Sequence, residues 1–151
     1  MGGGVGLASI CDVAIGVENA WMGLTETKLG LIPATIGPYV IARMGEAAAR
    51  RVFMSARKFS AQEAQSLGLL AKTVAEDALD RAVTAEVTPY LSCAPGAVAA
   101  AKKLARALGP VIDAQTIEMT VTALIAQWES PEAEEGIAAF FGKTAPRWQI
   151  G

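Results

Sequence analysis

One glutamate in the first part of the chain is the strongest candidate for acid–base chemistry. Glu26 lies between Thr25 and Thr27, in a segment that is otherwise dense in apolar side chains. A carboxyl group among such neighbours suits proton transfer near neutral pH, although a solvated loop glutamate would fit the same pattern. The chain contains no histidine, which excludes Ser-His-Asp and Cys-His catalysis and histidine-based metal sites. We therefore expect no metal centre.

A run of glycines at residues 2–6, Gly-Gly-Gly-Val-Gly, is the second candidate. It is not a dinucleotide fingerprint, because Leu7 stands where the last glycine of that motif is needed. It also lacks the Gly-Lys-Ser/Thr of a phosphate-binding P-loop. Two interpretations remain: a tight turn whose amides point at an anion at a helix N-terminus, or a flexible tail. A short helix is predicted at residues 7–11.

Composition and charge exclude several classes of partner. The net charge is −2 at pH 7, so the chain has no basic field that would attract nucleic acid. We expect no membrane-spanning helix, because every long apolar stretch is interrupted by charges or breakers. The first residues lack the basic and apolar regions of a signal peptide, which makes the cytoplasm or an organellar matrix the expected location. Hydrophobic residues make up 52% of the chain, which indicates an oligomer or a fragment of a larger protein.

Apolar runs and breakers predict an α/β segment followed by helices. Short strands are predicted at residues 12–16, 20–24 and 69–74, and helices at 39–44, 46–55 and 60–67. The third of these helices opens with a capping box, in which Ser60 accepts from the amide of Glu63 and Glu63 reaches back. Gly68 is its expected C′ residue. A boundary near Val74 gives two domains, residues 1–75 and 76–151.

The second part reads as helices separated by proline and glycine. Helices are predicted at residues 77–88, 95–108, 112–128 and 131–141. Pro89 must end or kink the first of them, and Pro95 suits the first turn of the next. The last helix is expected to begin with Ser130 as its N-cap and Pro131 in its first turn.

Two further groups of side chains allow a functional and a structural interpretation. Lys102, Lys103 and Arg106 share one predicted helix and could attract a phosphorylated ligand, although such a cluster is more often a solvated face. The aromatic residues near the C-terminus are expected to be core or subunit-interface residues rather than ligand stackers. These are Phe140, Phe141 and Trp148.

Five segments, in order and with ordinary spacing, resemble the crotonase superfamily, the enoyl-CoA hydratase/isomerase type. They are residues 2–12 (GGGVGLASICD), 22–33 (MGLTETKLGLIP), 59–69 (FSAQEAQSLGL), 93–102 (CAPGAVAAAK) and 135–140 (EGIAAF). Each segment is weak alone, but together they cover essentially the whole chain. The segments GGGVGL and LTETKLGLIPATIGPYV are most similar to the branch of methylglutaconyl-CoA and carboxygeranoyl-CoA hydratases.

This resemblance implies a fold and an assembly. The implied fold is α/β, a partial crotonase-like ββα spiral followed by a C-terminal all-helical trimerisation region. The implied assembly is a homotrimer, or a hexamer built as a dimer of trimers. The chain starts where the third glycine-rich segment of the family begins, so we expect an N-terminal truncation that removes one oxyanion amide and much of the CoA pocket. We expect such a chain alone to be catalytically weak or inactive.

The resemblance also implies a lyase that adds water across the 2,3 double bond of an acyl-CoA thioester. Two backbone amides hold the thioester oxygen in this family, and Gly3 is the matching donor here, because glycine lets the backbone come close. Glu26 matches the family's proton-transferring glutamate. Contacts to substrate or CoA are expected from Gly2, Gly4, Leu24, Pro33 and Lys143. No separate cofactor is implied, since coenzyme A is part of the substrate.

One departure from the family pattern leaves alternatives open. Gly6 stands where many hydratases carry a second glutamate that helps to activate water. An isomerase that moves a double bond with Glu26 alone is one alternative, and an inactive copy that binds CoA or assembles with a full-length relative is another. Lys28 is a candidate partner for a carboxylate on the substrate, although alternation along the chain could equally point it away.

Overall fold

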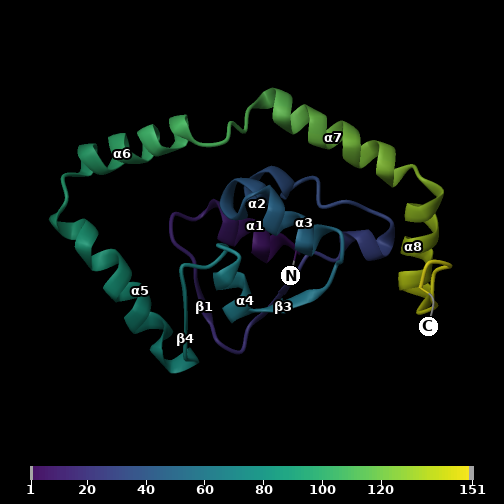
Figure 1. The fold of residues 1–151 in the computed structure, drawn as a ribbon, viewed down its shortest axis with the longest axis horizontal. Helices are drawn as coiled ribbons and strands as arrows, with labels where there is room; N and C mark the ends of the chain where they lie inside the picture. The colour runs from purple at the N-terminus through teal and green to yellow at the C-terminus, as the bar shows by residue number, and fades with distance from the viewer. Residues whose placement is uncertain (1, 150–151) are drawn as a thin grey trace.

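The computed structural model describes residues 2–149 as a compact centre with an arc of helices around it (Figure 1). The centre contains α1 (Gly2–Ile10), β1 (Ile15–Val17), β2 (Trp21–Gly23), the 3₁₀-helix η1 (Glu26–Leu29), α2 (Gly37–Met44), α3 (Glu46–Phe53), β3 (Lys58–Ser60), α4 (Ala61–Ser66) and β4 (Lys72–Val74). The arc contains η2 (Glu76–Ala78), α5 (Leu79–Val87), η3 (Thr88–Ser92), α6 (Pro95–Leu108), α7 (Ala114–Trp128) and α8 (Pro131–Gly142).

The hydrophobic core lies inside the compact centre. Its largest fully buried side chains are contributed by helices α1 to α3, by β3 and by the loops that follow β2 and α4. The largest of them are Phe59, Leu24, Leu69, Val5, Val40 and Val52. Because these segments share one core, the centre holds the start of η1, and with it Glu26, in a fixed position.

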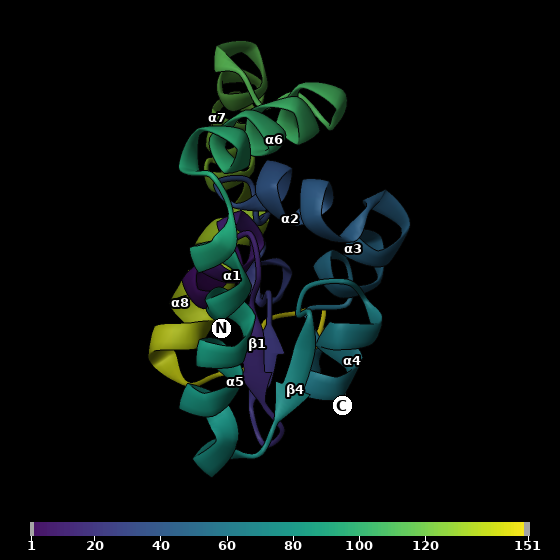
Figure 2. The same ribbon diagram turned by 90° about the vertical axis from the view of Figure 1, so that its left-hand side faces the viewer.

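Two short strand pairs cross the centre. β1 pairs in parallel with β4, with Ile15 opposite Lys72, and β2 pairs antiparallel with β3. Figure 2 shows β1 and β4 side by side, with α5 alongside. Gly16 of β1 is buried, and a Cβ there would lie 2.5 Å from Cδ1 of Leu70, so this strand passes too close to the core for a side chain. The mixture of helices and strands confirms the α/β class.

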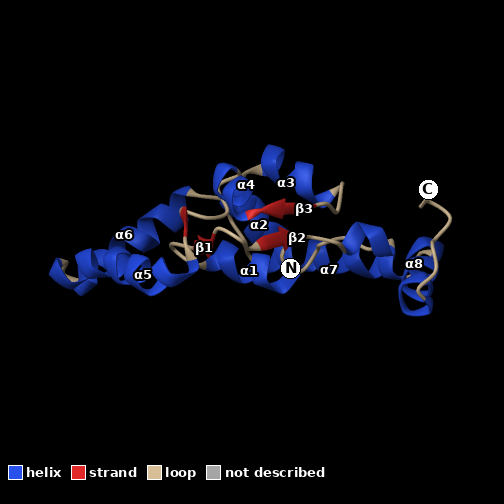
Figure 3. Ribbon diagram, turned by 90° about the horizontal axis from the view of Figure 1, so that it is seen from below, coloured by secondary structure: helices blue, strands red, loops and turns tan. Residues whose placement is uncertain are grey.

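The arc is attached to the centre at a few points. α5 is joined to β4 by an ion pair between Lys72 and Glu86, at 2.8 Å. Lys102 of α6 pairs with Asp12 at 2.7 Å, and α8 packs against η1. Figure 3 shows the result from below, with the strands in the middle and the arc helices extending to both sides.

The arc leaves much apolar surface uncovered. In the described structure, α5, α6 and α7 contain no buried residue. Leu91 is 88% exposed and Leu108 is 81% exposed, whereas side chains of this kind are normally inside a protein. The excess of apolar residues in the composition therefore lies here. None of the helices in residues 2–149 is long and apolar enough to cross a membrane.

Two of the predicted helix starts are confirmed by caps. Ser130 accepts a hydrogen bond from the amide of Ala133 at 3.1 Å, and Pro131 opens α8. Ser60 accepts from the amide of Glu63 at 3.2 Å. The second half of that capping box is wrong, because the Glu63 carboxylate binds Arg57 instead, with Nη1 and Oε2 2.7 Å apart.

Other predictions differ from the structure. Residues 2–6 are the first turns of α1, so the flexible-tail interpretation is wrong for Gly2–Gly6. The strand predicted at 69–74 covers only the last three of those residues, because the amides of Leu69 and Leu70 donate to the carbonyl of Ala64, at 2.9 and 3.3 Å. The 3₁₀-helix at Glu26 was not predicted. The division into residues 1–75 and 76–151 stays a prediction.

Candidate active site

Glu26 is held at the start of η1, directly after β2 and a fully buried leucine. Leu24 is 1% exposed and anchors the chain in the core two residues before Glu26. The carbonyl of Glu26 accepts from the amide of Leu31 at 3.0 Å. Gly30 ends the turn with a φ of +69°, a conformation that glycine adopts without strain. The backbone therefore fixes where the Glu26 side chain starts.

The carboxylate of Glu26 is partly shielded from solvent, and one of its oxygen atoms lacks a hydrogen-bond partner within the described residues. Its Oε2 atom is buried and has no hydrogen-bond partner among residues 2–149. Its Oε1 atom lies against the first turn of α1, where a Cβ added to Gly2 would be 3.6 Å away. Buried polar atoms are nearly always paired in native proteins, and an unpaired one calls for an explanation such as a catalytic role.

The first turn of α1 is open to a ligand. Gly3 and Gly4 are exposed, and a Cβ at either position would meet no heavy atom of residues 2–149 within 4 Å. The first four amides of a helix have no partner inside the helix, and they carry a partial positive charge. Glu26 therefore lies beside a helix end whose backbone can be approached closely by an anion or a carbonyl oxygen.

Farther along α1, the face beside Glu26 is closed. Gly6 is buried, and a Cβ there would lie 2.6 Å from Cγ2 of Ile36 and 3.2 Å from its Cβ. Positions 2 and 6 are four residues apart and share one face of the helix. Gly2 thus faces a carboxylate and Gly6 faces an isoleucine.

Helix α8 supports the far side of the Glu26 turn. A Cβ at Gly136 would lie 2.5 Å from the carbonyl carbon of Leu29. A Cβ at Gly30 would overlap the backbone of Glu132. These two glycines therefore allow backbone-to-backbone contact between η1 and α8, which side chains at either position would prevent.

Two side-chain hydrogen bonds complete this support. Nε2 of Gln127, at the end of α7, donates to the carbonyl oxygen of Gly30 at 2.7 Å. Oγ1 of Thr27 donates to the carbonyl oxygen of Phe53 at 3.1 Å. The turn is held from the arc and from α3, so the position of Glu26 depends on both parts of the chain.

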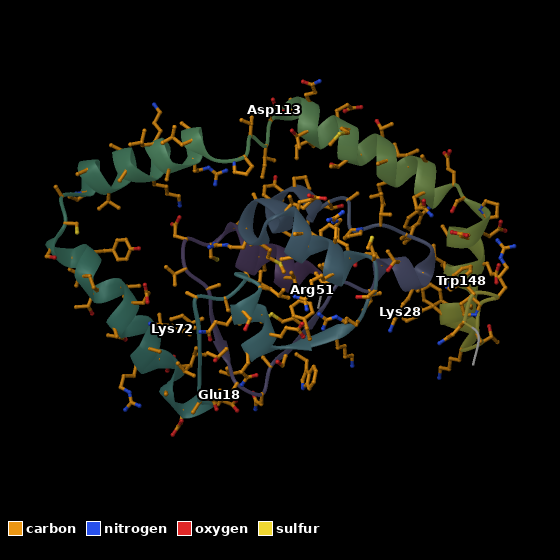
Figure 4. The ribbon with its side chains drawn as sticks, in the orientation of Figure 1. Glu18, Lys28, Arg51, Lys72, Asp113 and Trp148 are labelled. Carbon is orange, nitrogen blue, oxygen red and sulfur yellow. The ribbon has the colours of Figure 1, made fainter. Side chains whose placement is uncertain are left out.

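The remaining candidate residues lie in different places. Pro33 is buried and lines an apolar cavity of about 360 Å³ between the loop before α2 and helix α7. Lys143 is exposed at the end of α8. Lys28 lines a cavity of about 380 Å³ beside α8, together with Trp148, and Glu26 is not among its lining residues. Figure 4 shows Lys28 and Trp148 on the α8 side of the molecule.

The basic cluster of α6 is partly engaged within the chain. Lys102 forms the ion pair with Asp12, and it lines a cavity of about 870 Å³ between α6 and the centre, with Arg106 and Arg43. Arg43 is itself engaged, since its Nε donates to the carbonyl of Ser9 at 3.3 Å. Residues 2–149 contain no group of three or more His, Cys, Asp or Glu side chains that could hold a metal.

Comparison with known proteins decides the family. The enoyl-CoA hydratase/isomerase family model matches residues 1–150. This chain belongs to that family, the crotonase superfamily. The resemblance seen in the five sequence segments is thus confirmed, and the family is one of enzymes.

Relatives of this crotonase chain extend over nearly all of it. It is 35% identical to methylglutaconyl-CoA hydratase of Rattus norvegicus over an alignment of 155 positions, which covers 99% of this chain and 49% of the relative. A carnitinyl-CoA dehydratase from Mycobacterium avium 104 has the same fold, with a TM-score of 0.85, 30% identity, and coverage of 99% and 60% of the two chains. Pseudomonas aeruginosa AtuE matches with a TM-score of 0.70, 37% identity, and coverage of 99% and 58%. The chain spans about half the length of the curated relatives it matches.

Several residues of this candidate site could not be recognised from the sequence as positioning residues. Gln127, Gly136 and Thr27 hold η1, yet they are far apart in the chain or carry no catalytic signal. The one available hint was Gly136, a glycine inside a predicted helix, where glycine costs stability relative to alanine. A close approach of two backbones explains why it stands there.

Proposed function

We propose that this chain supplies the glutamate and one oxyanion donor of an enoyl-CoA hydratase, which adds water across the 2,3 double bond of an acyl-CoA thioester. One observation carries the proposal: the Glu26 carboxylate, whose Oε2 atom is buried and has no hydrogen-bond partner among residues 2–149, lies beside the exposed amino-terminal turn of α1. A base and an electropositive helix end are thus adjacent. That pairing suits a reaction in which a proton moves while negative charge grows on an oxygen.

In the proposed reaction, the amide of Gly3 donates to the thioester oxygen. Its place in the first turn of α1 leaves it without a partner inside the helix. As negative charge develops on that oxygen, the donor stabilises it more strongly than it stabilises the neutral thioester. Glu26 transfers the proton at the carbon atoms next to the thioester. The second amide donor would come from the part of the enzyme that this chain does not span.

The other proposed contacts follow from where the residues lie. Gly2 and Gly4 would let the thioester approach the helix end, because neither carries a side chain. Leu24 would support the Glu26 turn from the core, and Pro33 would border an apolar cavity suited to an acyl chain. Lys143, exposed at the end of α8, would pair with a CoA phosphate. Coenzyme A enters as part of the substrate, so no separate cofactor is proposed.

The proposed partner in solution is the protein itself, as a homotrimer or a hexamer. The apolar side chains exposed on α5, α6 and α7 support this, since monomers rarely leave such surface uncovered. The proposed location is the cytoplasm. The proposed substrate is a branched enoyl-CoA, because the similarity includes proteins named methylglutaconyl-CoA hydratase.

Isomerisation of the double bond is a second candidate, favoured by a single observation. The face of α1 beside Glu26 is occupied at Gly6 by Ile36 rather than by a second carboxylate. Moving a double bond requires a proton to leave one carbon and return to another, which one carboxylate can do alone.

Product analysis separates the two reactions. We would assay the chain alone and a completed protein, in which it is joined to the segment of Pseudomonas aeruginosa AtuE that it does not span. The substrates would be crotonyl-CoA and methylglutaconyl-CoA, with loss of the enoyl absorbance followed and product masses measured. We expect the completed protein to add water and the chain alone to be weak or inactive. Products of unchanged mass would favour the isomerase, and no turnover of either substrate would contradict the hydratase.

A further inference from the structure

The first two turns of α1 place two different neighbours on one face. Gly2 and Gly6 are one helical turn apart, which is about 5.4 Å along the axis. Oε1 of Glu26 lies over Gly2, and the side chain of Ile36 lies over Gly6. The carboxylate and the isoleucine therefore lie along one face of α1, next to the helix end at which the proposed function places the thioester.

The contact at Gly6 is too close for a side chain unless Ile36 moves. A Cβ there would lie 2.6 Å from Cγ2 of Ile36 and 3.2 Å from Cβ. The second distance matters most, because the Cβ of Ile36 cannot move by rotation about χ1. Its backbone is fixed by α2, whose Val40 amide donates to the carbonyl of Ile36 at 3.0 Å. A side chain at position 6 would therefore require the Ile36 methyl group to move and α1 and α2 to separate by a few tenths of an ångström.

We infer that Ile36 is a specificity-determining residue that keeps this site to one carboxylate, so that Glu26 performs both proton transfers of the reaction. The inference rests on the proposed hydratase function. Ile36 acts through the space it fills beside α1, and it denies that space to a second acid or base.

A single carboxylate can transfer every proton that this hydration requires. As the water oxygen bonds to C3 of the enoyl group, one water proton passes to the Glu26 carboxylate. The C2–C3 π electrons move toward the thioester oxygen, giving the enolate held by the Gly3 amide. The enolate then takes the same proton from Glu26 at C2. Water has been added, and Glu26 returns to its ionised form. Both additions occur from the Glu26 face.

The packing half of the inference is tested by a double-mutant cycle on the 151-residue chain, with the Tm of each variant measured by thermal unfolding. Alanine is a better helix former than glycine, so Gly6→Ala would raise the Tm if space were available. We expect it instead to lower the Tm by about 3–10 °C. In an Ile36→Gly background the same change should raise the Tm. Gly4→Ala is the matched control, because its Cβ meets open space, and it should not lower the Tm in either background.

The catalytic half is tested by the pH dependence of kcat/KM for the completed protein. We expect one carboxylate ionisation to govern hydration in the parent, and a second to appear in the Gly6→Glu/Ile36→Gly variant. A parent profile that needs two carboxylates would overturn the inference. So would a Tm cycle in which Gly6→Ala behaves the same with and without Ile36. Absence of any hydration, with the Tm cycle as expected, would overturn the proposed function and leave the packing assignment standing.

Discussion

At the scale of single residues, the Glu63 carboxylate has a different partner from the one that its sequence pattern predicts. Glu63 was expected to complete a capping box, but Arg57 binds it from six residues upstream. Buried Ala56 has a φ of +47°, a left-handed conformation in which a non-glycine residue is uncommon. Sequence patterns do not indicate this turn, which directly precedes Arg57. They therefore could not show that the Glu63 carboxylate would bind Arg57.

This pairing predicts how stability depends on pH. The hydrogen bond from Arg57 holds the pKa of Glu63 below its usual value. The pKa of Glu63 in the folded state is therefore lower than in the unfolded state, so the ion pair stabilises the fold above about pH 4. This stabilisation is lost as the pH falls through the lowered pKa of the folded state. The Tm difference between the parent and Glu63→Gln should therefore shrink between pH 7 and pH 3. Glu76→Gln, at an exposed position, serves as the control. A difference that grows on acidification would contradict the assignment.

The residue types alone predicted part of the candidate site. Glu26 and the glycine run were recognisable because few residue types can transfer protons or let a backbone come close. The structure adds that they are neighbours, since Oε1 of Glu26 lies against Gly2. The sequence could not show that Ile36 fills the space over Gly6, because the two residues are thirty positions apart and contact each other only through the packing of α1 on α2.

At the scale of elements, the packing of α8 on η1 should control the position of Glu26. A methyl group at Gly136 would press on the backbone of Leu29, a contact that cannot relax by side-chain rotation. We expect Gly136→Ala to cost about 1–3 kcal/mol of unfolding free energy and to lower kcat of the completed protein. Gly142→Ala is the matched control, because its added Cβ would make only ordinary contacts. Equal effects of the two changes in denaturant unfolding would contradict the role of α8.

The hydrogen bond from Gln127 offers a milder change at the same contact. Gln127→Ala leaves the partly enclosed carbonyl of Gly30 without this donor, and we expect it to cost about 1 kcal/mol. Gln115→Ala, at an exposed position on the same helix, should change the unfolding free energy by less than about 0.5 kcal/mol. Urea unfolding of the two variants compares them directly. If the costs are indistinguishable, the hydrogen bond does not hold η1.

Helices were easier to predict from the sequence than strands, for a physical reason. Serine and proline mark helix starts through local hydrogen bonds and fixed φ angles, so α6 and α8 were found with their boundaries. Strands of three residues pair with distant segments, and their limits depend on where pairing stops. The 3₁₀-helix η1 spans only Glu26–Leu29, which is too short for a periodic apolar pattern.

At the scale of the whole molecule, the arc is the feature that needs a partner. Many of the uncovered apolar side chains lie on α5 to α7, including Leu108 at 81% exposure. We expect the completed protein to assemble as a trimer or hexamer, and Leu108→Lys to lower its mass in multi-angle light scattering. Gln115→Lys, also exposed on the arc, is the charge-matched control, because both changes add one positive charge. A monomeric completed protein would contradict the assembly.

The course of the arc itself could not be predicted from the sequence, because it follows from long-range contacts at only a few points.

The central claim is that Glu26 transfers the proton in hydration of an enoyl-CoA. The most direct measurement is kcat for water addition by the completed protein carrying Glu26→Gln, compared with Glu18→Gln at an exposed position. The amide has nearly the same shape as the carboxylate but cannot accept a proton. We predict a loss of roughly 100- to 10,000-fold for Glu26→Gln, with the Tm nearly unchanged and Glu18→Gln close to the parent. A Glu26→Gln variant that hydrates at the parent rate would contradict the account.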